Sequence, residues 1–236
     1  MRDSKHDPLA RAATPAAARA ERPSAPIPAP SRPEFPVRSN LGPAVRATLL
    51  TLLLTGVAYP LTMTGLARVL FPRRSAGSFV ADANGKVVGS ELIAQPFAGP
   101  GYFHPRPSAA GDGGWDASSS GGSNLGPTSR KLRDVAAARL ARLVGENPGA
   151  PLPVPAELVM ASASGLDPHL SPAAALWQAP RVASARRLAV ERVRALVSEF
   201  TEGRDLGVLG EPRVNVLLLN LALDRRLGAP ELPSGG

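Results

Sequence analysis

The sequence contains no cysteine and few aromatic residues among its 236 positions. The lack of cysteine excludes disulfides, zinc–thiolate centres and a cysteine nucleophile. Aromatic residues make up 4% of the chain, so any core must be built mainly from alanine, valine and leucine. The 26 prolines and 23 glycines indicate long loops between the elements that form this core.

The sequence also lacks the motifs that mark common catalytic sites. It has no phosphate-binding G-x-x-x-x-G-K-[ST] loop, no strand-borne G-x-G-x-x-G and no D-K-T-G around an aspartate. No G-x-S-x-G elbow surrounds a serine. His6 lies in the N-terminal tail, and His104 and His169 lie far apart in proline-flanked loops. We therefore predict no catalytic residues and no metal site in this chain.

The formal charge of +8 is concentrated outside the part of the chain that is expected to fold. Residues 1–46 hold 8 Lys and Arg against 4 Asp and Glu, and Arg68, Arg73 and Arg74 follow. From Ser75 onward, 16 basic residues accompany 15 acidic ones. A nucleic-acid-binding domain should carry its basic patch on the fold itself, so nucleic acid is not an expected partner. The basic flank instead suits anionic lipid headgroups.

The charge-free stretch 47–67 is bracketed by Arg46 and Arg68. As a helix it would extend roughly 30 Å, the thickness of the hydrocarbon core of a bilayer. Pro60 would break such a helix in water, whereas in lipid neighbouring helices, threonine hydroxyls or a local kink can satisfy the freed backbone groups. Tyr59 lies too near mid-membrane for an interfacial aromatic residue, so we expect it to face protein. We predict a single transmembrane helix; a buried helix of a soluble domain is the alternative.

Composition divides the chain into four parts. Residues 1–40 are rich in proline and alanine and predict a disordered tail, too long for the n-region of a cleaved signal peptide. Residues 41–74 comprise the transmembrane helix and its basic flank, residues 75–228 an extramembranous domain, and residues 229–236 a C-terminal tail. Because the first tail holds more Lys and Arg than the downstream flank, we expect a cytoplasmic N-terminus.

The extramembranous part predicts an α+β fold in which helices predominate. Asn84-Gly85 lies between two short β-prone runs within residues 78–89, which indicates a small β-hairpin. Residues 99–128 lack periodicity but carry side chains too specific for a plain linker, so we predict a functional loop that binds an ion, a lipid or protein.

Four helices are expected after this loop, each marked at its ends by polar caps, proline or glycine. The first is capped by Thr128 or Ser129 and runs to about Glu146, and the second runs from Pro172 past Gln178. The third runs from about Arg181 to Phe200, and the last is the segment that ends on Arg225, Arg226 and Gly228. The apolar face of the first should comprise Leu132, Val135, Ala136, Leu140 and Leu143.

Three short motifs have both a chemical and a structural interpretation. Residues 120–124 can form a backbone nest for an anion, but without an adjacent lysine a glycine-hinged loop is the better interpretation. Asp167 and His169, separated by Pro168, could form an acid–base pair. Loop capping is the better interpretation, because Asp and His side chains often bind the backbone groups of turns. Glu211 and Arg213 are expected to form an ion pair before the last helix.

A series of motifs also recurs in a specific order along the chain. They are residues 56–60, 89–97, 102–104 with 106–108, 120–128, 161–169, Gln178 with 181–183, 210–216 and 219–224. Together they resemble the C subunit of the Kdp-type potassium-transporting ATPase family, over about Leu41 to Asp224. The tail before Leu41 is longer than is usual in the family, and Ala94 stands where the family commonly has glycine.

The resemblance implies an accessory subunit of an ATP-driven, high-affinity K⁺ uptake complex in the bacterial inner membrane. Its partners would be a K⁺-binding, channel-like subunit and a P-type ATPase subunit, with lipid around the span. Members of the family are often described as catalytic chaperones that raise the ATP affinity of the ATPase subunit. ATP would reach this chain through that subunit, and no firmly bound cofactor is expected.

The resemblance also implies two sets of site residues. Nucleotide coupling would involve Gln95, Ser120, Gly121, Gly122, Ser123 and Asn124. The subunit interface would involve Tyr59, Pro60, Tyr102, Phe103, His104, Arg106, Asp167 and His169. Contact with ATP requires the domain in the cytoplasm, whereas a cytoplasmic N-terminus places it on the outer face, as the architecture of the family does. We expect the outer face.

Two other classes of protein remain as alternatives. A free-standing membrane-anchored envelope hydrolase would need a nucleophile and a base within hydrogen-bond reach, around His104 or His169. A membrane-bound DNA-binding regulator is disfavoured by the near-neutral charge of the domain.

Overall fold

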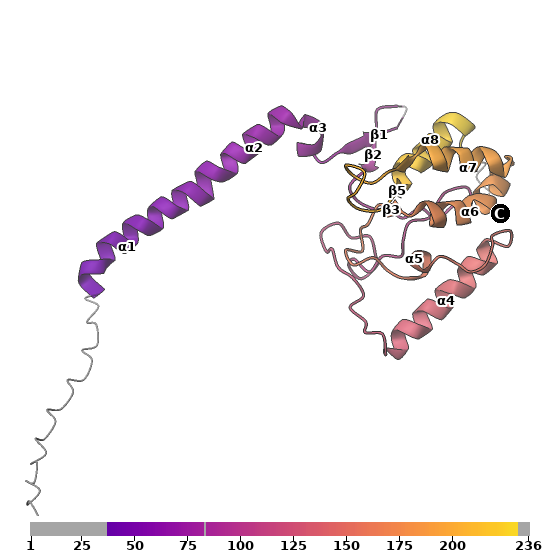
Figure 1. Ribbon diagram of the computed structural model, residues 1–236, viewed down its shortest axis with the longest axis horizontal. Coiled ribbons are helices and arrows are strands. Elements are labelled where there is room, and N and C mark those ends of the chain that lie inside the picture. The colour runs from indigo at the N-terminus through magenta and orange to yellow at the C-terminus, as the bar shows by residue number, and fades with distance from the viewer. Residues whose placement is uncertain (1–36, 83, 231–236) are drawn as a thin grey trace, which may run out of the picture. The chain divides into compact units, whose positions relative to one another are not determined.

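The computed structural model describes residues 37–82 and 84–230 (Figure 1). It falls into two compact units, residues 1–56 and 57–236. The described part of the first unit is helical and consists of α1 (Val37–Thr51) and the start of the π-helix η1 (Leu52–Ala58). The second unit contains the rest of η1, α2 (Tyr59–Leu70), the short α3 (Pro72–Ser75) and the domain that follows them.

The N-terminal helical stretch Asn40–Leu70 is long and apolar enough to cross a membrane, and none of its most apolar part is buried within the chain. Within residues 37–82 and 84–230 it is the one helix that meets this test. The predicted apolar N-terminal helix is therefore confirmed. The predicted tails 1–40 and 229–236 lie largely outside the described residues.

The backbone changes its hydrogen-bonding pattern just before Pro60. Because Pro60 has no N–H, a regular α-helix would leave the carbonyl of Gly56 without its donor. The π-helical turn that precedes Pro60 shifts the pairing by one residue, as is common where a helix accommodates a disruption. The hydroxyl of Thr55 also donates to the carbonyl oxygen of Thr51 at 2.7 Å, in the manner expected of threonine in a lipid-exposed helix.

The predicted hairpin is confirmed. β1 (Phe79–Ala81) pairs antiparallel with β2 (Val87–Ser90). The connection between the strands is longer than a two-residue turn. The carboxylate of Asp82 holds it by accepting the N–H groups of Asn84 and Lys86 at 2.8 and 3.0 Å. Gly85 adopts a φ of 79°, a conformation that glycine reaches without strain.

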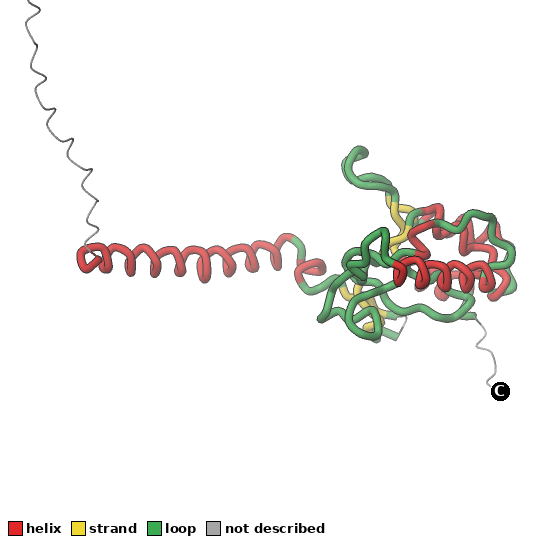
Figure 2. The backbone as a smooth tube through the Cα atoms, turned by 90° about the horizontal axis from the view of Figure 1, so that it is seen from below, coloured by secondary structure: helices red, strands yellow, loops and turns green. Residues whose placement is uncertain are grey.

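A second small sheet was not predicted. β5 (Arg213–Asn215) lies between β3 (His169–Leu170) and β4 (Thr201–Glu202), and both neighbours run antiparallel to it. Figure 2 shows the strands of the domain as short yellow segments among helices and loops. Its strands are two or three residues long, too short to show the alternation of polar and apolar residues that marks a strand in a sequence.

Helices dominate the domain, as predicted. They are α4 (Arg130–Glu146), α5 (Ala156–Val159), α6 (Pro172–Ala185), α7 (Val190–Glu199) and α8 (Val216–Leu227). The side chains of Ser129, Ser171 and Asn215 cap α4, α6 and α8 by accepting a backbone N–H. The sequence indicated the caps at Ser129 and Ser171, whereas the cap at Asn215 was not predicted.

The predicted break between the second and third helices is wrong. Pro180 lies inside α6, and the chain turns only at Arg187, where φ is 54° and the N–H of Leu188 donates to the carbonyl of Ala183 at 2.9 Å. Most of α6 is buried, from Ala174 to Ala183. Tertiary packing therefore outweighs the hydrogen bond that Pro180 removes.

The core lies among α6, α7, α8 and the three-stranded sheet, with Phe103 from the long loop fully buried in it (Figure 1). α4 contributes only part of its predicted apolar face. Leu143 is buried, whereas Leu140 is 43% exposed. The other predicted members, Leu132, Val135 and Ala136, are partly buried.

The predicted ion pair between Glu211 and Arg213 is wrong. Arg213 pairs with Glu202 across the sheet at 3.1 Å and with Asp205 at 3.2 Å. Glu211 pairs with Arg204 at 2.8 Å. A tight turn between Arg204 and Glu211, which was not predicted, brings these partners together.

Asn215 connects the last helix to the hairpin. Its Oδ1 accepts the N–H of Leu218 at 3.2 Å, and its Nδ2 donates to the carbonyl of Glu91 at 2.8 Å. We predict that Asn215→Ala lowers the free energy of unfolding by about 2–3 kcal/mol, because a cap and the partner of a partly buried carbonyl are lost together. The cap-only variant Ser129→Ala should cost about 1 kcal/mol. Denaturation of the full chain in detergent, followed by tryptophan fluorescence, measures both; equal costs would contradict the bridging role.

Candidate functional site

Residues 99–106 pass through the interior of the domain without regular secondary structure. Gly101, Phe103 and Pro105 are buried, and the residues between them are partly buried. A buried backbone N–H or C=O that lacks a partner costs about 1–3 kcal/mol, so a segment of this kind needs partners from elsewhere in the fold. Side chains from α6, its C-terminal end and α8 supply them.

Two carboxamides pair with consecutive residues of this segment as a neighbouring strand would. Asn220 of α8 accepts the N–H of Phe103 and donates to its carbonyl, both at 2.9 Å. Gln178 of α6 does the same with His104, at 2.9 and 3.0 Å. A side-chain amide has the same donor and acceptor as a peptide group. These two side chains therefore replace the β-ladder that the segment lacks.

Arg181 binds two further carbonyls of the segment. Its Nη1 donates to the carbonyls of Pro100 and Tyr102 at 2.6 and 3.0 Å. Its Nη2 donates to Oε1 of Gln178 at 2.7 Å, and its Nε to Oδ1 of Asn147 at 2.9 Å. Burial lowers the pKa of Arg181 to about 10, so the guanidinium stays charged at neutral pH. Arg181 thereby fixes the amide of Gln178 in the orientation that pairs with His104.

The imidazole of His104 is part of the same network. Its Nε2 lies 3.0 Å from the carbonyl oxygen of Gly99, which selects the tautomer that donates from Nε2. Burial, and then the positive charge of Arg181, lower the pKa of His104 below its ordinary 6.5. The ring is therefore neutral at pH 7 and serves to hold the loop.

The beginning of the segment is held by an aromatic and ionic cluster. The hydroxyl of Tyr102 donates to Asp224 at 3.0 Å, and Arg186 pairs with the other oxygen of Asp224 at 2.8 Å. Arg186 also donates to the carbonyl of Gly101 at 2.6 Å and lies 4.9 Å from the centre of the Tyr102 ring. This cluster ties residues 101 and 102 to the end of α8.

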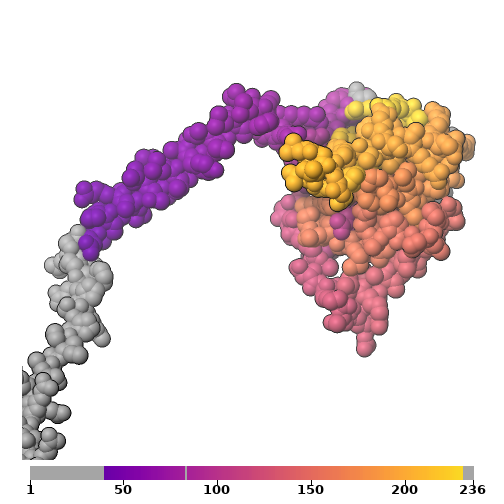
Figure 3. Space-filling model, in the orientation of Figure 1, coloured from indigo at the N-terminus to yellow at the C-terminus, as the bar shows by residue number. Residues whose placement is uncertain are grey.

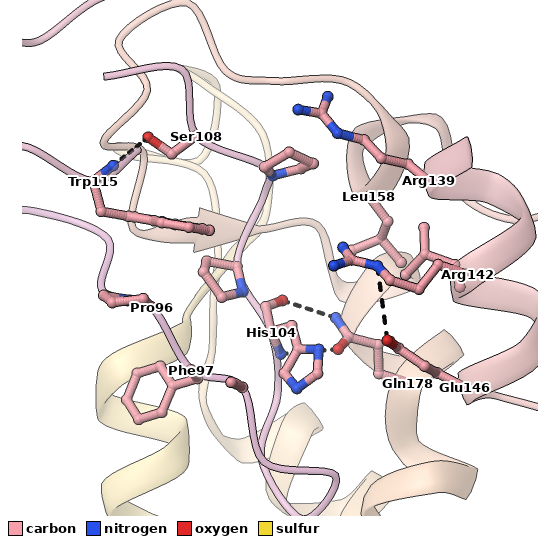
Figure 4. Close-up of a pocket in the computed structure, with 14 residues that line it drawn as sticks. Pro96, Phe97, His104, Ser108, Trp115, Arg139, Arg142, Glu146, Leu158 and Gln178 are labelled. Atoms are coloured by element: carbon pink, nitrogen blue, oxygen red, sulfur yellow. Dashed lines mark hydrogen bonds and ion pairs between the residues drawn. The ribbon is translucent and has the colours of Figure 1, made fainter. Parts of the chain in front are cut away.

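A pocket of about 540 Å³ opens between this segment and α4. Figure 4 shows Arg139 and Arg142 projecting from α4 on one side, with Trp115 and Phe97 on the opposite side. Arg142 lies 3.7 Å from Glu146, while Arg139 donates to a backbone carbonyl at 3.0 Å. The remaining lining residues are Pro96, Ala98, His104, Pro105, Pro107, Ser108, Leu143, Leu158 and Gln178.

This pocket combines an apolar floor with a basic wall. Such a surface suits contact with an apolar or acidic part of another molecule. In residues 37–82 and 84–230 no group of three or more His, Cys, Asp or Glu side chains is placed to hold a metal ion.

The Asp167 motif has the loop-capping role that the sequence favoured. The carboxylate accepts the N–H of His169 at 3.0 Å and pairs with Arg106 at 3.1 Å. Burial raises the pKa of Asp167, but the hydrogen bonds from His169 and the charge of Arg106 outweigh burial and leave the pKa below its usual value. Ser120 lines the same surface cavity as Arg106 and Asp167.

Residues 120–124 form a docked loop. The hydroxyl of Ser120 and the N–H of Gly121 both donate to the carbonyl of Ser164, at 2.9 and 2.8 Å. A Cβ on Gly122 would lie 2.9 Å from the carbonyl oxygen of Ala163, so the two backbones approach closely only because residue 122 is glycine. Ser123 and Asn124 are exposed. Because the N–H of Gly121 is engaged, the segment is a poor anion nest.

Gln95 is also engaged with the backbone. Oriented so that both its groups are satisfied, the carboxamide donates to the carbonyl of Val88 at 2.9 Å and accepts the N–H of Ser90 at 3.2 Å. A Cβ on Gly89 would overlap the amide, so glycine at that position makes room for it. Gln95 thus supports β2 as Asn220 and Gln178 support residues 103 and 104.

The predicted site residues fall into separate places. Tyr102, Phe103 and His104 lie together in the buried segment. Arg106, Asp167 and Ser120 line a second, surface cavity, and the N–H of His169 donates to Asp167. Gln95 lies on the hairpin, and Tyr59 and Pro60 lie in the apolar helix. Their predicted roles in coupling and at an interface stay predictions.

The sequence did not indicate the roles of Asn220, Gln178 and Arg181. Each is a polar residue among the buried, mostly apolar residues of its helix. For Asn220 a signal was available. This asparagine lies within the apolar run LLLNLAL, and a buried side-chain amide there needs a hydrogen-bond partner inside the protein.

The fold and the site define a class of protein: a domain joined to an apolar, membrane-length helix, with its buried polar side chains devoted to its own backbone. The family model described as "K+-transporting ATPase, c chain" (KdpC) matches residues 41–225. The chain therefore belongs to the KdpC family, which confirms the resemblance noted from its motifs.

Curated relatives agree with this assignment. The potassium-transporting ATPase KdpC subunit of Myxococcus xanthus is 64% identical over 185 residues, which cover 78% of this chain and 87% of the relative. The KdpC subunit of Rhodospirillum rubrum is 59% identical over 187 residues, which cover 79% of this chain and 96% of the relative. That of Methylobacterium nodulans is 54% identical over 200 residues, which cover 80% and 98%.

Removal of one carboxamide should test its role in the buried segment. We predict that Asn220→Ala lowers the free energy of unfolding by about 3 kcal/mol, because it leaves both polar groups of Phe103 without a partner. Asn124→Gly is the control: this asparagine is exposed and has a φ of 51°, which glycine tolerates, so the change should cost less than about 1 kcal/mol. Denaturant titration of the full chain in detergent gives both values, and similar costs would contradict the pairing.

The lowered pKa of His104 predicts a specific loss of stability in mild acid. Below its ordinary pKa of 6.5 the unfolded chain takes up a proton that the folded chain accepts only at lower pH, so stability falls as the pH drops from about 6.5 toward the folded-state pKa. In His104→Gln this contribution is absent, and its free energy of unfolding should fall less steeply than that of the wild type between about pH 7 and pH 5. Parallel pH profiles would show that the ring does not titrate as described.

Proposed function

We propose that this chain is the accessory C subunit of an ATP-driven K⁺ transport complex, which it stabilises and supports without carrying out the chemistry. Membership of the KdpC family over residues 41–225 is the observation that carries the proposal. The structure supports it in that His104 and Asp167, the best candidates for acid–base chemistry, are engaged in holding loops. The same engagement gives no support to a free-standing envelope hydrolase.

The partners in this proposal are a K⁺-binding, channel-like subunit and a P-type ATPase subunit. The apolar helix would pack beside them in the membrane, where the exposed Tyr59 is available to meet protein. The pocket between residues 96–108 and α4 offers the domain a rigid contact surface, because the buried segment that forms its floor is held by Gln178 and Arg181.

We further propose that the subunit influences ATP hydrolysis indirectly, through contacts with its partners. The carboxamide of Gln95 pairs with β2, and the hydroxyl of Ser120 and the N–H of Gly121 pair with Ser164, so these three of the residues suggested for nucleotide coupling already have partners. A role as a catalytic chaperone would then operate by favouring one conformation of the ATPase subunit.

The proposed location is the bacterial inner membrane, with the N-terminus in the cytoplasm and the domain on the outer face. The basic surplus of residues 1–46 favours this orientation. It also agrees with an indirect effect on hydrolysis, since ATP is scarce outside the cytoplasm.

Deletion of the chain tests the accessory role. We predict that the two larger subunits purified without it lose most of their K⁺-stimulated ATPase activity and that adding back the full chain restores it. Gln95→Ala tests the indirect effect more specifically. In the complex, this substitution should leave the KM for ATP within about twofold of the wild-type value. It should lower the denaturation midpoint of the chain, because β2 loses the hydrogen bonds of the Gln95 carboxamide. Unchanged activity without the chain would reject the accessory role. A large rise in KM with unchanged stability would indicate direct nucleotide contact.

A single introduced cysteine tests the orientation, since the chain has none of its own. Ser118 is exposed, so Ser118→Cys should react with an impermeant thiol reagent in intact cells from which the outer membrane has been removed. Ser31→Cys in the N-terminal tail is the matched control and should react only after permeabilisation. The reverse pattern would place the domain in the cytoplasm.

A further inference from the structure

The loop between β4 and β5 exposes three large aliphatic side chains together. Leu206, Val208 and Leu209 are 90%, 72% and 58% exposed. Figure 3 shows this part of the chain as a gold projection from the surface of the domain. A group of aliphatic residues at one projecting point is a feature of contact surfaces rather than of a surface that meets only water.

The backbone of this loop is strained at Leu206. Leu206 and Gly207 have φ values of 53° and 77°, and the N–H of Val208 donates to the carbonyl of Asp205 at 3.2 Å. Two consecutive residues with positive φ are typical of a type I′ turn, whose first central position favours Asn, Asp or Gly. A leucine is strained there, and because its side chain lies in solvent it gains no packing energy in return.

The turn is rigid in spite of its exposure. Asp205 and Leu209 exchange both backbone hydrogen bonds, at 2.8 and 2.9 Å. At the base of the turn, Arg204 contacts both carboxylate oxygens of Glu211 at 2.9 and 2.8 Å. The backbone that carries the three aliphatic side chains is therefore held in one conformation before any partner binds, which reduces the entropy that binding would cost.

The charges around the turn favour a protein partner over lipid. Glu202, Asp205 and Glu211 outnumber Arg204 and Arg213, and both arginines are paired with these carboxylates. A loop that enters a membrane surface usually presents unpaired Lys or Arg together with Trp or Tyr. Residues 202–213 contain no aromatic residue, and their net acidic rim would be repelled by anionic headgroups.

We propose that Leu206, Val208 and Leu209 form a preformed plug that inserts into an apolar, basic-rimmed pocket of one of the larger subunits. This inference rests on the proposed function, because it requires a transport complex to which the chain belongs. Docking accounts for the strain in the turn. Asparagine would be less strained than leucine at position 206, but the aliphatic side chain of leucine is needed for docking.

The substitution Leu206→Asn separates docking from folding. Asparagine completes the Asn-Gly pair that a type I′ turn prefers, so the melting temperature of the free chain should equal or exceed that of the wild type. The Kd of the full chain for the assembly of the two larger subunits should rise by about tenfold or more, because a buried leucine is lost from the interface. Leu152→Asn, at a position that is 75% exposed elsewhere on the domain, is the matched control and should leave the Kd within about twofold.

The outcomes are distinguishable. If the wild-type chain fails to bind the larger subunits, the proposed function is wrong. If the wild type binds and Leu206→Asn binds equally well, only the plug is wrong. A lower melting temperature together with weaker binding would mean that Leu206 serves the fold, which also overturns the inference.

An environment-sensitive fluorophore on Leu206→Cys distinguishes protein from lipid as the occupant. With the full chain alone in nanodiscs that contain anionic lipid, the emission should remain that of a dye in water. Addition of the larger subunits should shift the emission to the blue. A blue shift in nanodiscs alone would assign the tip to the membrane surface, and no shift in the assembled complex would exclude a buried tip.

Discussion

An irregular backbone segment can be buried only if each of its polar groups finds a partner, and this constraint governs the domain. Residues 99–106 meet it through side chains: Asn220 and Gln178 act as short pieces of a β-ladder, and Arg181 binds two carbonyls. Because α6 and α8 both bind the same segment, their positions are fixed relative to each other. The same hydrogen bonds hold the part of the segment that lines the pocket beside α4.

The same device appears on the hairpin, where the Gln95 carboxamide pairs with the backbone of β2. The domain has short strands and few aromatic residues, so side-chain amides supply order that a larger sheet or core would otherwise provide. Many polar residues in the family motifs thus have a structural explanation. In the proposed function, the surfaces that contact other subunits are the apolar helix, the pocket beside α4 and the tip of the loop between β4 and β5.

Local signals in the sequence were enough to predict the apolar helix, the hairpin, α4 and α8. Capping residues and charge-free length act over a few positions, so one segment alone reveals them. The three-stranded sheet, the break after α6 and the partners of Arg213 depend on tertiary contacts. The pairing of His104 with Gln178 joins positions 74 apart, which no local pattern indicates. Asn220 was visible as a polar residue in an apolar run, but its partner was not.

Hydrogen exchange at the amides of Phe103 and His104 measures whether the side chains of Asn220 and Gln178 hold the buried segment. If Asn220 and Gln178 hold these groups as a ladder, both amides should exchange only when the whole domain unfolds, as slowly as the best protected amides of α6 and α8. The exposed loop residue Gly113 provides the fast reference. Exchange of Phe103 and His104 at a rate near that of Gly113 would show that the segment opens locally, and the account of the domain would be wrong.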